Sequence, residues 1–147
     1  MAEHATETMV IAAPAARIWE VLLDFEAYPE WARDLKGVTV GPLGEDGRPR
    51  EVTFRAAAMG RSTSYTLAYE YGEDPLTLRW RLVRGDIQRV LDGSYVLEPV
   101  EGDPDRTKVT YDLAVELIVP LPSFVKRRAE GKIVHTALRE LRARVEG

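Results

Sequence analysis

Residues 13–31 restrict the fold of this chain more than any other segment. Apolar side chains recur there at helical spacing, at Ile18, Val21, Leu22 and Phe25. Pro14 suits the first turn of a helix, where its missing N–H would have no partner, so we predict a helix that begins near Pro14. Pro29 should push Tyr28 toward an extended conformation and let a second short helical turn begin. The segment predicts two short helices in tandem, between an opening strand and a series of hairpins.

Apolar and polar residues alternate after these helices, as in strands with one buried face. The alternating segments are residues 51–58, 64–71, 76–84, 87–97 and 108–119, preceded by an opening strand at 6–12, a weak strand at 38–40 and an exposed loop at 44–49. Turn-forming residues separate them at Met59-Gly60-Arg61, Gly72-Glu73-Asp74-Pro75, Gly85-Asp86 and Gly102-Asp103-Pro104-Asp105. In the segment 87–97, the odd positions, Arg89 included, are expected to share one face. The pattern predicts an antiparallel, two-sided sheet.

A long amphipathic helix is predicted at the end of the chain. Pro120-Leu121-Pro122 should end the last strand, and apolar residues then recur at helical spacing at Val134, Leu138, Leu141 and Val145. A curved meander needs its apolar face covered, and this helix is the element long enough to lie across it. The fold class is therefore α+β.

The order of these elements and the motif Asp24-Phe25-x-x-Tyr28-Pro29-x-Trp31 resemble the polyketide cyclase/dehydrase branch of the START-like (SRPBCC) superfamily. The resemblance covers almost the whole chain. It implies a single domain over residues 1–147 with the helix-grip fold, in which a curved antiparallel sheet wraps around a long C-terminal helix and two short helices follow the first strand. It also implies an internal cavity. The superfamily includes carriers, cyclases and quinone-binding proteins, so the resemblance leaves the ligand open.

Aromatic side chains gather on the strand faces that should point inward, and Ala56 and Ala58 leave space beside them. Such walls suit an apolar ligand oriented by a few polar contacts. For any one of these side chains, packing in a solid core is the first interpretation, and the implied cavity is what favours a ligand site for the set. The predicted ligand-binding residues are Trp31, Phe54, Tyr65, Tyr69, Trp80, Tyr95, Tyr111 and His135.

Three of the polar or aromatic residues have alternative roles. Trp31 could form a wall or gate of the cavity, or join the short helices to the sheet. Asp24 is interpreted as a helix-end residue in preference to a catalytic acid. His135 could reach the cavity rim as an acid, base or donor, but we favour a histidine on the helix surface or at its boundary, because the nearby sequence supplies no partner. Gly131, in the same helix, suggests close packing, a bend or space for a ligand.

Composition excludes several classes of function. The 147 residues, 45% of them hydrophobic, suit one domain with a sizeable core, and the net charge of −4 argues against DNA binding. With no cysteine and two distant histidines, we predict no metal and no cofactor. P-loop, dinucleotide-binding and serine-hydrolase motifs are absent. The sequence shows neither a signal-peptide block nor an apolar run of roughly 20 residues, so we expect a cytoplasmic protein without a transmembrane segment.

Three functions remain open. The first is noncatalytic binding or transport of a hydrophobic small molecule, such as a lipid, an isoprenoid or a polyketide. The second is a polyketide aromatase, cyclase or dehydratase that uses Tyr65, Tyr69, Tyr95, Tyr111 and Arg89 as polar groups. The third is an interaction module that uses the basic cluster Lys126-Arg127-Arg128. The sequence leaves a homodimer open.

Overall fold

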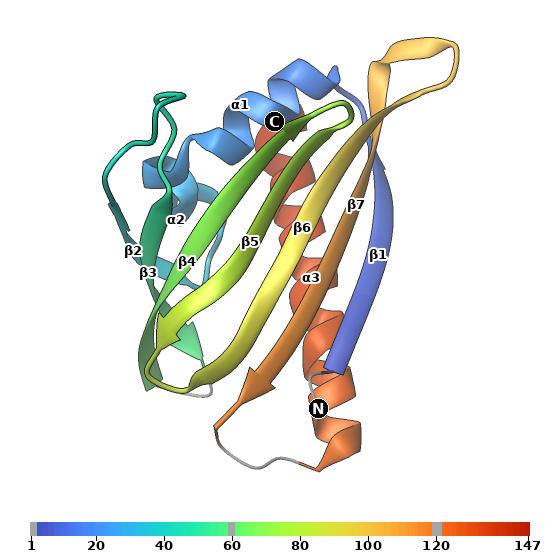
Figure 1. The fold of residues 1–147 in the computed structure, drawn as a ribbon. Helices are drawn as coiled ribbons and strands as arrows, with labels where there is room; N and C mark the ends of the chain where they lie inside the picture. Colours follow the sequence, from blue (N-terminus) through green and yellow to red (C-terminus); the bar gives the residue numbers. More distant parts are fainter. Residues whose placement is uncertain (1–2, 59–60, 119–121) are drawn as a thin grey trace.

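One antiparallel sheet of seven strands curves around a long C-terminal helix, as predicted (Figure 1). The computed structural model describes residues 3–58, 61–118 and 122–147, without the side chains of Glu3, Ala58, Arg61, Ser123, Phe124, Lys126 and Arg127. The strands are β1 (Glu3–Ile11), β2 (Leu35–Val40), β3 (Glu51–Ala58), β4 (Arg61–Glu73), β5 (Leu76–Gly85), β6 (Gln88–Val100) and β7 (Asp103–Leu117). The helices are α1 (Ala15–Leu23), the 3-10 helix η1 (Phe25–Ala27), α2 (Tyr28–Trp31) and α3 (Ser123–Glu146).

The strand order across the sheet is β1-β7-β6-β5-β4-β3-β2, and each neighbouring pair is antiparallel. The weak strand expected at 38–40 is the end of β2, which pairs with β3 and forms one edge of the sheet. At the other edge, β1 pairs with β7. The first strand is therefore an edge strand next to β7, and it also contacts α3.

The tandem helices form as predicted, but the bend between them lies earlier than expected. α1 begins directly after Pro14, and α2 carries Pro29 in its first turn. Tyr28 is helical, with φ −51° and ψ −42°, so the prediction that Pro29 holds it extended is wrong. The break falls at Asp24, with φ −87° and ψ 70°. The Tyr28 hydroxyl donates a 2.6 Å hydrogen bond to the carbonyl oxygen of Leu22, and this buried anchor outweighs the steric preference before proline.

The alternation predicted for β6 fails at its first residues. A register shift after Gln88 buries Gln88 and exposes Arg89. The Gln88 amide donates to the Thr63 hydroxyl at 3.0 Å, which satisfies the buried polar group. The prediction that Arg89 points inward is therefore wrong, because a bulge reverses the alternation of side chains. Farther along the strand the alternation holds, and Tyr95 is buried.

The apolar stripe predicted for α3 covers the concave face of the sheet. Its buried members are Val134, Leu138, Leu141 and Val145. Gly131 is exposed, and no atom lies within 4 Å of the position that a Cβ would take. Close packing is therefore not the reason for a glycine in this helix.

Polar contacts hold the C-terminal half of α3 against the segments that flank the short helices, before α1 and after α2. The Glu146 carboxylate accepts a 2.8 Å hydrogen bond from the backbone N–H of Ala12. Glu140 likewise accepts from the N–H of Arg33 at 3.1 Å. The helix therefore has a defined position over the sheet as well as an apolar contact with it.

Two predicted breaks, at Met59-Gly60 and at Pro120-Leu121, lie outside the described residues. The reversal predicted at Gly85 is confirmed, since β5 ends there and β6 begins at Gln88. β7 begins at Asp103, earlier than predicted, because Gly102 takes the positive φ of 79° that ends the turn.

Gly93 and Gly131 provide a matched pair of tests for this packing. A Cβ at Gly93 would lie 2.6 Å from the Asp112 carbonyl oxygen and 2.7 Å from Cζ2 of Trp80. We expect Gly93→Ala to lower the free energy of unfolding by about 1–3 kcal/mol, because neither neighbour can withdraw easily. Gly131→Ala should raise it by up to about 1 kcal/mol, since alanine favours a helix. Urea unfolding measures both, and equal midpoints for the two variants would contradict the described packing.

Candidate functional site

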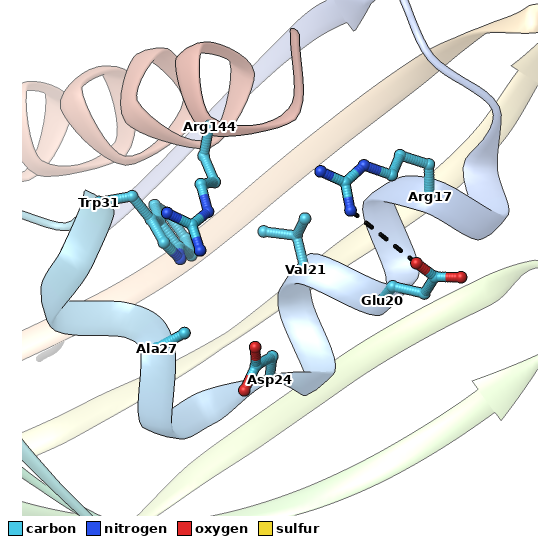
Figure 2. A pocket seen from close by; sticks show the side chains of 7 residues that line it. All are labelled: Arg17, Glu20, Val21, Asp24, Ala27, Trp31 and Arg144. Carbon is cyan, nitrogen blue, oxygen red and sulfur yellow. Dashed lines mark ion pairs between the residues drawn. The ribbon is translucent and has the colours of Figure 1, made fainter. Parts of the chain in front are cut away.

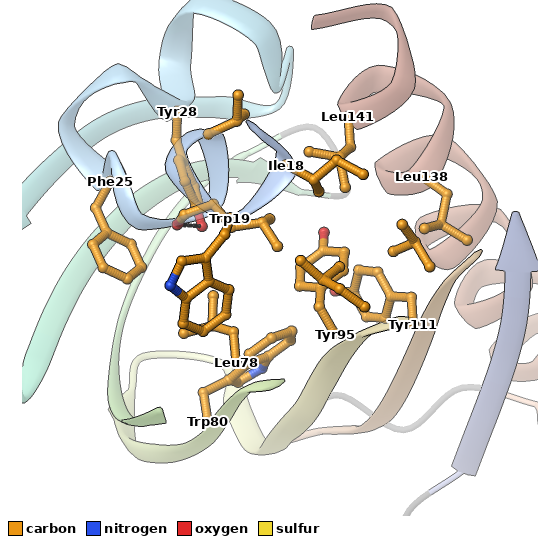
Figure 3. Packing of buried hydrophobic residues seen from close by; sticks show 14 of the residues in the cluster. Ile18, Trp19, Phe25, Tyr28, Leu78, Trp80, Tyr95, Tyr111, Leu138 and Leu141 are labelled. Carbon is orange, nitrogen blue, oxygen red and sulfur yellow. Dashed lines mark hydrogen bonds between the residues drawn. The ribbon is translucent and has the colours of Figure 1, made fainter. Parts of the chain in front are cut away.

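Four aromatic rings of the buried core come from neighbouring strands, one from each of β4, β5, β6 and β7. Figure 3 shows Trp80, Tyr95 and Tyr111 among the packed side chains. Tyr69 pairs across the strands with Trp80, and Tyr95 pairs with Tyr111. The ring centroids of Tyr69 and Trp80 are 6.0 Å apart, and those of Tyr95 and Tyr111 are 4.4 Å apart. Gly93 lies opposite Trp80, and its missing side chain leaves the room that the indole occupies. The strand register therefore builds one continuous aromatic surface.

The short helices extend this surface on the side of β3 and β4. The ring of Phe25 lies 4.7 Å from that of Tyr69, and the ring of Tyr28 lies 5.4 Å from that of Phe25. Tyr28 also stacks with Phe54, which in turn stacks with Tyr65 at 5.6 Å. The aromatic residues of the motif therefore join the sheet to α1 and α2. We call this set the aromatic cluster; it consists of Phe25, Tyr28, Phe54, Tyr65, Tyr69, Trp80, Tyr95 and Tyr111.

The tyrosine hydroxyls of this cluster differ in their partners. Tyr28 donates to a backbone carbonyl, but Tyr69, Tyr95 and Tyr111 make no hydrogen bond with another described residue. These three residues are only 9%, 7% and 7% exposed. Among the described residues, every side-chain nitrogen or oxygen that is fully enclosed has a partner. The three hydroxyls are therefore not fully enclosed, and each keeps some surface open to water.

Burial keeps these hydroxyls protonated. It raises the pKa of Tyr28, Tyr69, Tyr95 and Tyr111 well above the ordinary tyrosine value. Repulsion from neighbouring tyrosinates adds to the shift, and for Tyr69 these neighbours include Tyr95 and Tyr111. At neutral pH they are uncharged donors on an apolar surface.

Most of the predicted site residues belong to this surface. Phe54, Tyr65, Tyr69, Trp80, Tyr95 and Tyr111 are all members of the aromatic cluster. Trp31 lies at its margin, with its ring 5.0 Å from that of Tyr28.

His135 lies away from the cluster. Its side chain is 52% exposed on α3, and its Nδ1 is 3.0 Å from Oε2 of Glu7 on β1. The histidine therefore joins the helix to the edge strand, as the surface interpretation of the sequence expects.

A small surface pocket of about 160 Å³ lies where α1, α2 and the end of α3 meet (Figure 2). Its lining residues are Arg17, Glu20, Val21, Asp24, Ala27, Trp31 and Arg144. Arg144 pairs with Glu30 at 3.2 Å. Trp31 thus has an outer side toward this pocket and an inner side toward Tyr28. Asp24 is exposed and ends α1, in agreement with the helix-end interpretation.

Arg48 is a structural residue that sequence reasoning missed. Its guanidinium carbon lies 5.8 Å from the ring centre of Trp19 on α1 and 5.3 Å from that of Tyr71 on β4. The Tyr71 hydroxyl donates to the carbonyl oxygen of Pro49 at 2.6 Å. The loop between β2 and β3 is therefore held against the sheet and α1. Beside it lies a surface pocket of about 450 Å³, whose lining includes Tyr69 of the aromatic cluster.

The described residues contain no cluster of three or more histidine, aspartate or glutamate side chains suited to a metal ion. Within residues 3–58, 61–118 and 122–147, none of the helices has both the length and the apolar character needed to cross a membrane.

The sheet, the covering helix and the aromatic interior define a START-like, helix-grip protein. Residues 2–146 match the model of the family described as polyketide cyclase / dehydrase and lipid transport, and the chain belongs to this family. None of the curated proteins matches the chain.

Solved structures agree with this assignment. A START superfamily protein from Mycobacterium smegmatis is 30% identical, with a TM-score of 0.88 over 97% of each chain. An aromatase/cyclase from Streptomyces sp. R1128 is 16% identical, with a TM-score of 0.81 over 99% of this chain and 94% of that one. A STAR-related lipid transfer protein from Xanthomonas axonopodis is 21% identical, with a TM-score of 0.73 over 98% of this chain and 86% of that one. The last two show the shared fold alone.

The contact of Arg48 with two rings predicts a measurable contribution to stability. We expect Arg48→Ala to lower the free energy of unfolding by about 1 kcal/mol, through the lost cation–π contacts. The pair with the exposed Glu73 should add little. Arg50→Ala, in the same loop and without a ring contact, is the control and should change stability less. Equal effects of the two variants in urea unfolding would contradict a special role for Arg48.

The buried tyrosines predict a loss of stability in alkali. Burial raises the pKa of Tyr65 to about 12, whereas an unfolded tyrosine ionises near pH 10. Above about pH 10 the unfolded chain therefore loses protons that the folded chain keeps, and the free energy of unfolding should fall as pH rises. Tyrosinate absorbance should then appear together with unfolding. Titration of most of the six tyrosines near pH 10 in the folded protein would contradict the described burial.

Proposed function

We propose that this protein binds a hydrophobic small molecule between the concave face of the sheet and its covering helices. The observation that carries the proposal is an aromatic surface with three largely buried tyrosines, Tyr69, Tyr95 and Tyr111, whose hydroxyls have no protein partner among the described residues. A solid core would pair such groups or replace them with apolar ones. An apolar site with a few placed donors is what a small-molecule ligand needs.

The comparisons support this proposal at the level of the family. The family description names cyclisation or dehydration of polyketides and lipid transport, and the Xanthomonas axonopodis structure is titled a lipid transfer protein. We propose a lipid, an isoprenoid or a polyketide-like molecule as the ligand of this chain. Two further statements about this protein remain predictions: its location in the cytoplasm and the formation of a homodimer.

Native mass spectrometry of freshly purified protein tests the proposal directly. We expect a mass above that of the chain, and release of a hydrophobic compound on denaturing extraction. Addition of apolar compounds to ligand-free protein should restore a bound species. If neither the purified protein nor the mixtures show a complex, the binding function is wrong.

Trp80 provides an optical test of where the ligand lies. Its indole contacts Tyr69, Tyr95 and Tyr111, so a ligand at the aromatic cluster should change its emission. We expect Trp80→Phe to abolish the fluorescence response to ligand and Trp31→Phe to preserve most of it. If Trp31→Phe abolished the response and Trp80→Phe preserved it, the ligand would lie at the outer pocket beside α1 and α2.

Catalysis of a cyclisation or dehydration is a second candidate function. It is favoured by the convergence of protonated hydroxyls, because such donors can stabilise the enolate character of a bound polyketide. Arg89 is exposed and does not join them. Incubation with a poly-β-ketone substrate should then give a product that a Tyr95→Phe/Tyr111→Phe variant forms far more slowly. An unchanged product distribution with and without protein would exclude this activity.

A third proposal is that the basic cluster Lys126-Arg127-Arg128, near the start of α3, binds a macromolecular partner. The side chains of Lys126 and Arg127 lie outside the described set, and Arg128 is exposed. Salt-sensitive copurification of a partner, lost when the three charges are reversed, would support it.

A further inference from the structure

We infer that the outer face of α3 docks this protein on the surface of an anionic lipid membrane. Four cations of the helix define this face, and we call them the basic stripe: Arg128, Lys132, Arg139 and Arg142. The inference rests on the third proposed function, a macromolecular partner for the basic helix, and it names that partner. It holds whichever small molecule the interior binds.

The four cations lie on one side of the helix. At about 3.6 residues per turn, positions 128, 132, 139 and 142 fall within an arc of about 80° and extend over about 21 Å of the helix axis. All four residues are exposed. None of their side chains forms a hydrogen bond or an ion pair with another described residue. The basic stripe is therefore a straight row of charge that the described part of the protein leaves unpaired.

The acidic residues of α3 do not neutralise this stripe. Glu130 is buried, with 4% of its surface exposed. Glu140 accepts a hydrogen bond from the backbone N–H of Arg33. Glu146 accepts one from the backbone N–H of Ala12. The helix therefore uses its carboxylates within the protein and turns its free cations toward solvent.

The distribution of charge over the whole chain strengthens this asymmetry. Residues 121–147 contain seven basic and three acidic side chains, a charge of +4, whereas the rest of the chain carries −8. A negatively charged surface therefore attracts α3 and repels the remainder, which orients the protein as it approaches. Each lysine or arginine held within a Debye length of an anionic bilayer adds to the attraction. A straight, exposed row of four can meet this condition at once.

Exposed aliphatic side chains beside the stripe favour a membrane as the anionic partner. Val125 is 37% exposed and lies one turn before Arg128, on the same side of the helix. Ile133 is 45% exposed and follows Lys132 at the margin of the stripe. Cations next to apolar side chains are the arrangement with which a helix binds the interface of an anionic bilayer.

A nucleic acid or an acidic protein fits this surface less well. Single-stranded nucleic acid is bound largely by stacking on aromatic side chains, and stable protein interfaces are often anchored by buried aromatic residues. The exposed large hydrophobic residues of the described chain are all aliphatic: Val10, Leu43, Val83, Ile118, Val125 and Ile133. The outer face of α3 therefore offers charge and small aliphatic contacts, without an aromatic anchor among the described side chains.

Cosedimentation of the full chain with vesicles tests the inference. The probes are vesicles of phosphatidylcholine alone and vesicles of equal parts phosphatidylcholine and phosphatidylglycerol. We expect the anionic vesicles to bind the protein at least about tenfold more tightly than the neutral ones. Raising NaCl from about 0.1 M to about 1 M shortens the Debye length from about 10 Å to about 3 Å and should release most of the bound protein. Equal binding to both kinds of vesicle, no binding to either, or binding that salt leaves unchanged would overturn the inference.

Two triple variants with the same change in net charge show which face docks. The first reverses three cations of the stripe and leaves the cluster at 126–128 intact: Lys132→Glu/Arg139→Glu/Arg142→Glu. The matched control reverses three exposed arginines of β5 that likewise have no partner among the described residues: Arg79→Glu/Arg81→Glu/Arg84→Glu. The stripe variant should bind anionic vesicles at least about tenfold more weakly than the unchanged chain, and the control nearly as tightly as it. Urea unfolding shows whether each variant is folded.

The outcomes separate this inference from the proposed functions. If the control loses as much affinity as the stripe variant, net charge drives the binding and the assignment to the stripe is wrong. If only reversal of Lys126, Arg127 and Arg128 abolishes binding, the third proposed function stands and the stripe is excluded. If polyuridylate or polyglutamate binds the chain more tightly than the anionic vesicles do, the partner is a nucleic acid or an acidic protein and the membrane is excluded. Native mass spectrometry reports the interior ligand of each variant independently of these results.

Discussion

The covering of the concave face by α3 is the contact on which the rest of the structure depends. Strands β4 to β7 place their aromatic and aliphatic side chains on one face, and this face would be costly to expose. The aliphatic stripe that includes Leu138 and Leu141 lies over it, and the contacts of Glu140 and Glu146 with backbone N–H groups fix the end of the helix. The sheet supplies wide aromatic rings, whereas the helix supplies a narrow aliphatic row.

The features that sequence predicted well depend on local patterns. Alternation along the strands identified Tyr69, Trp80, Tyr95 and Tyr111 as inward-facing, because a strand places every second side chain on one face. Helical spacing identified the stripe of α3 in the same way. The resemblance to a known family added the way in which these elements pack together, which local patterns do not contain.

The features that sequence did not predict depend on contacts between distant segments. The bulge at Gln88 turns Arg89 outward, and its polar partner Thr63 lies on another strand. Tyr28 is helical before a proline because a hydrogen bond and three neighbouring rings hold it. Arg48 lies in a loop of ordinary turn composition, yet it contacts rings of α1 and β4. In each case the deciding partner is remote in sequence.

The central claim is that the hydroxyls of Tyr69, Tyr95 and Tyr111 face space that a ligand can occupy. A high-resolution crystal structure of protein purified without denaturation tests it most directly. The account predicts electron density beside these hydroxyls, from an ordered ligand or from waters, at hydrogen-bonding distance. Hydroxyls bonded to protein groups, with aliphatic side chains of α1 and α3 packed tightly against the rings, would contradict the account.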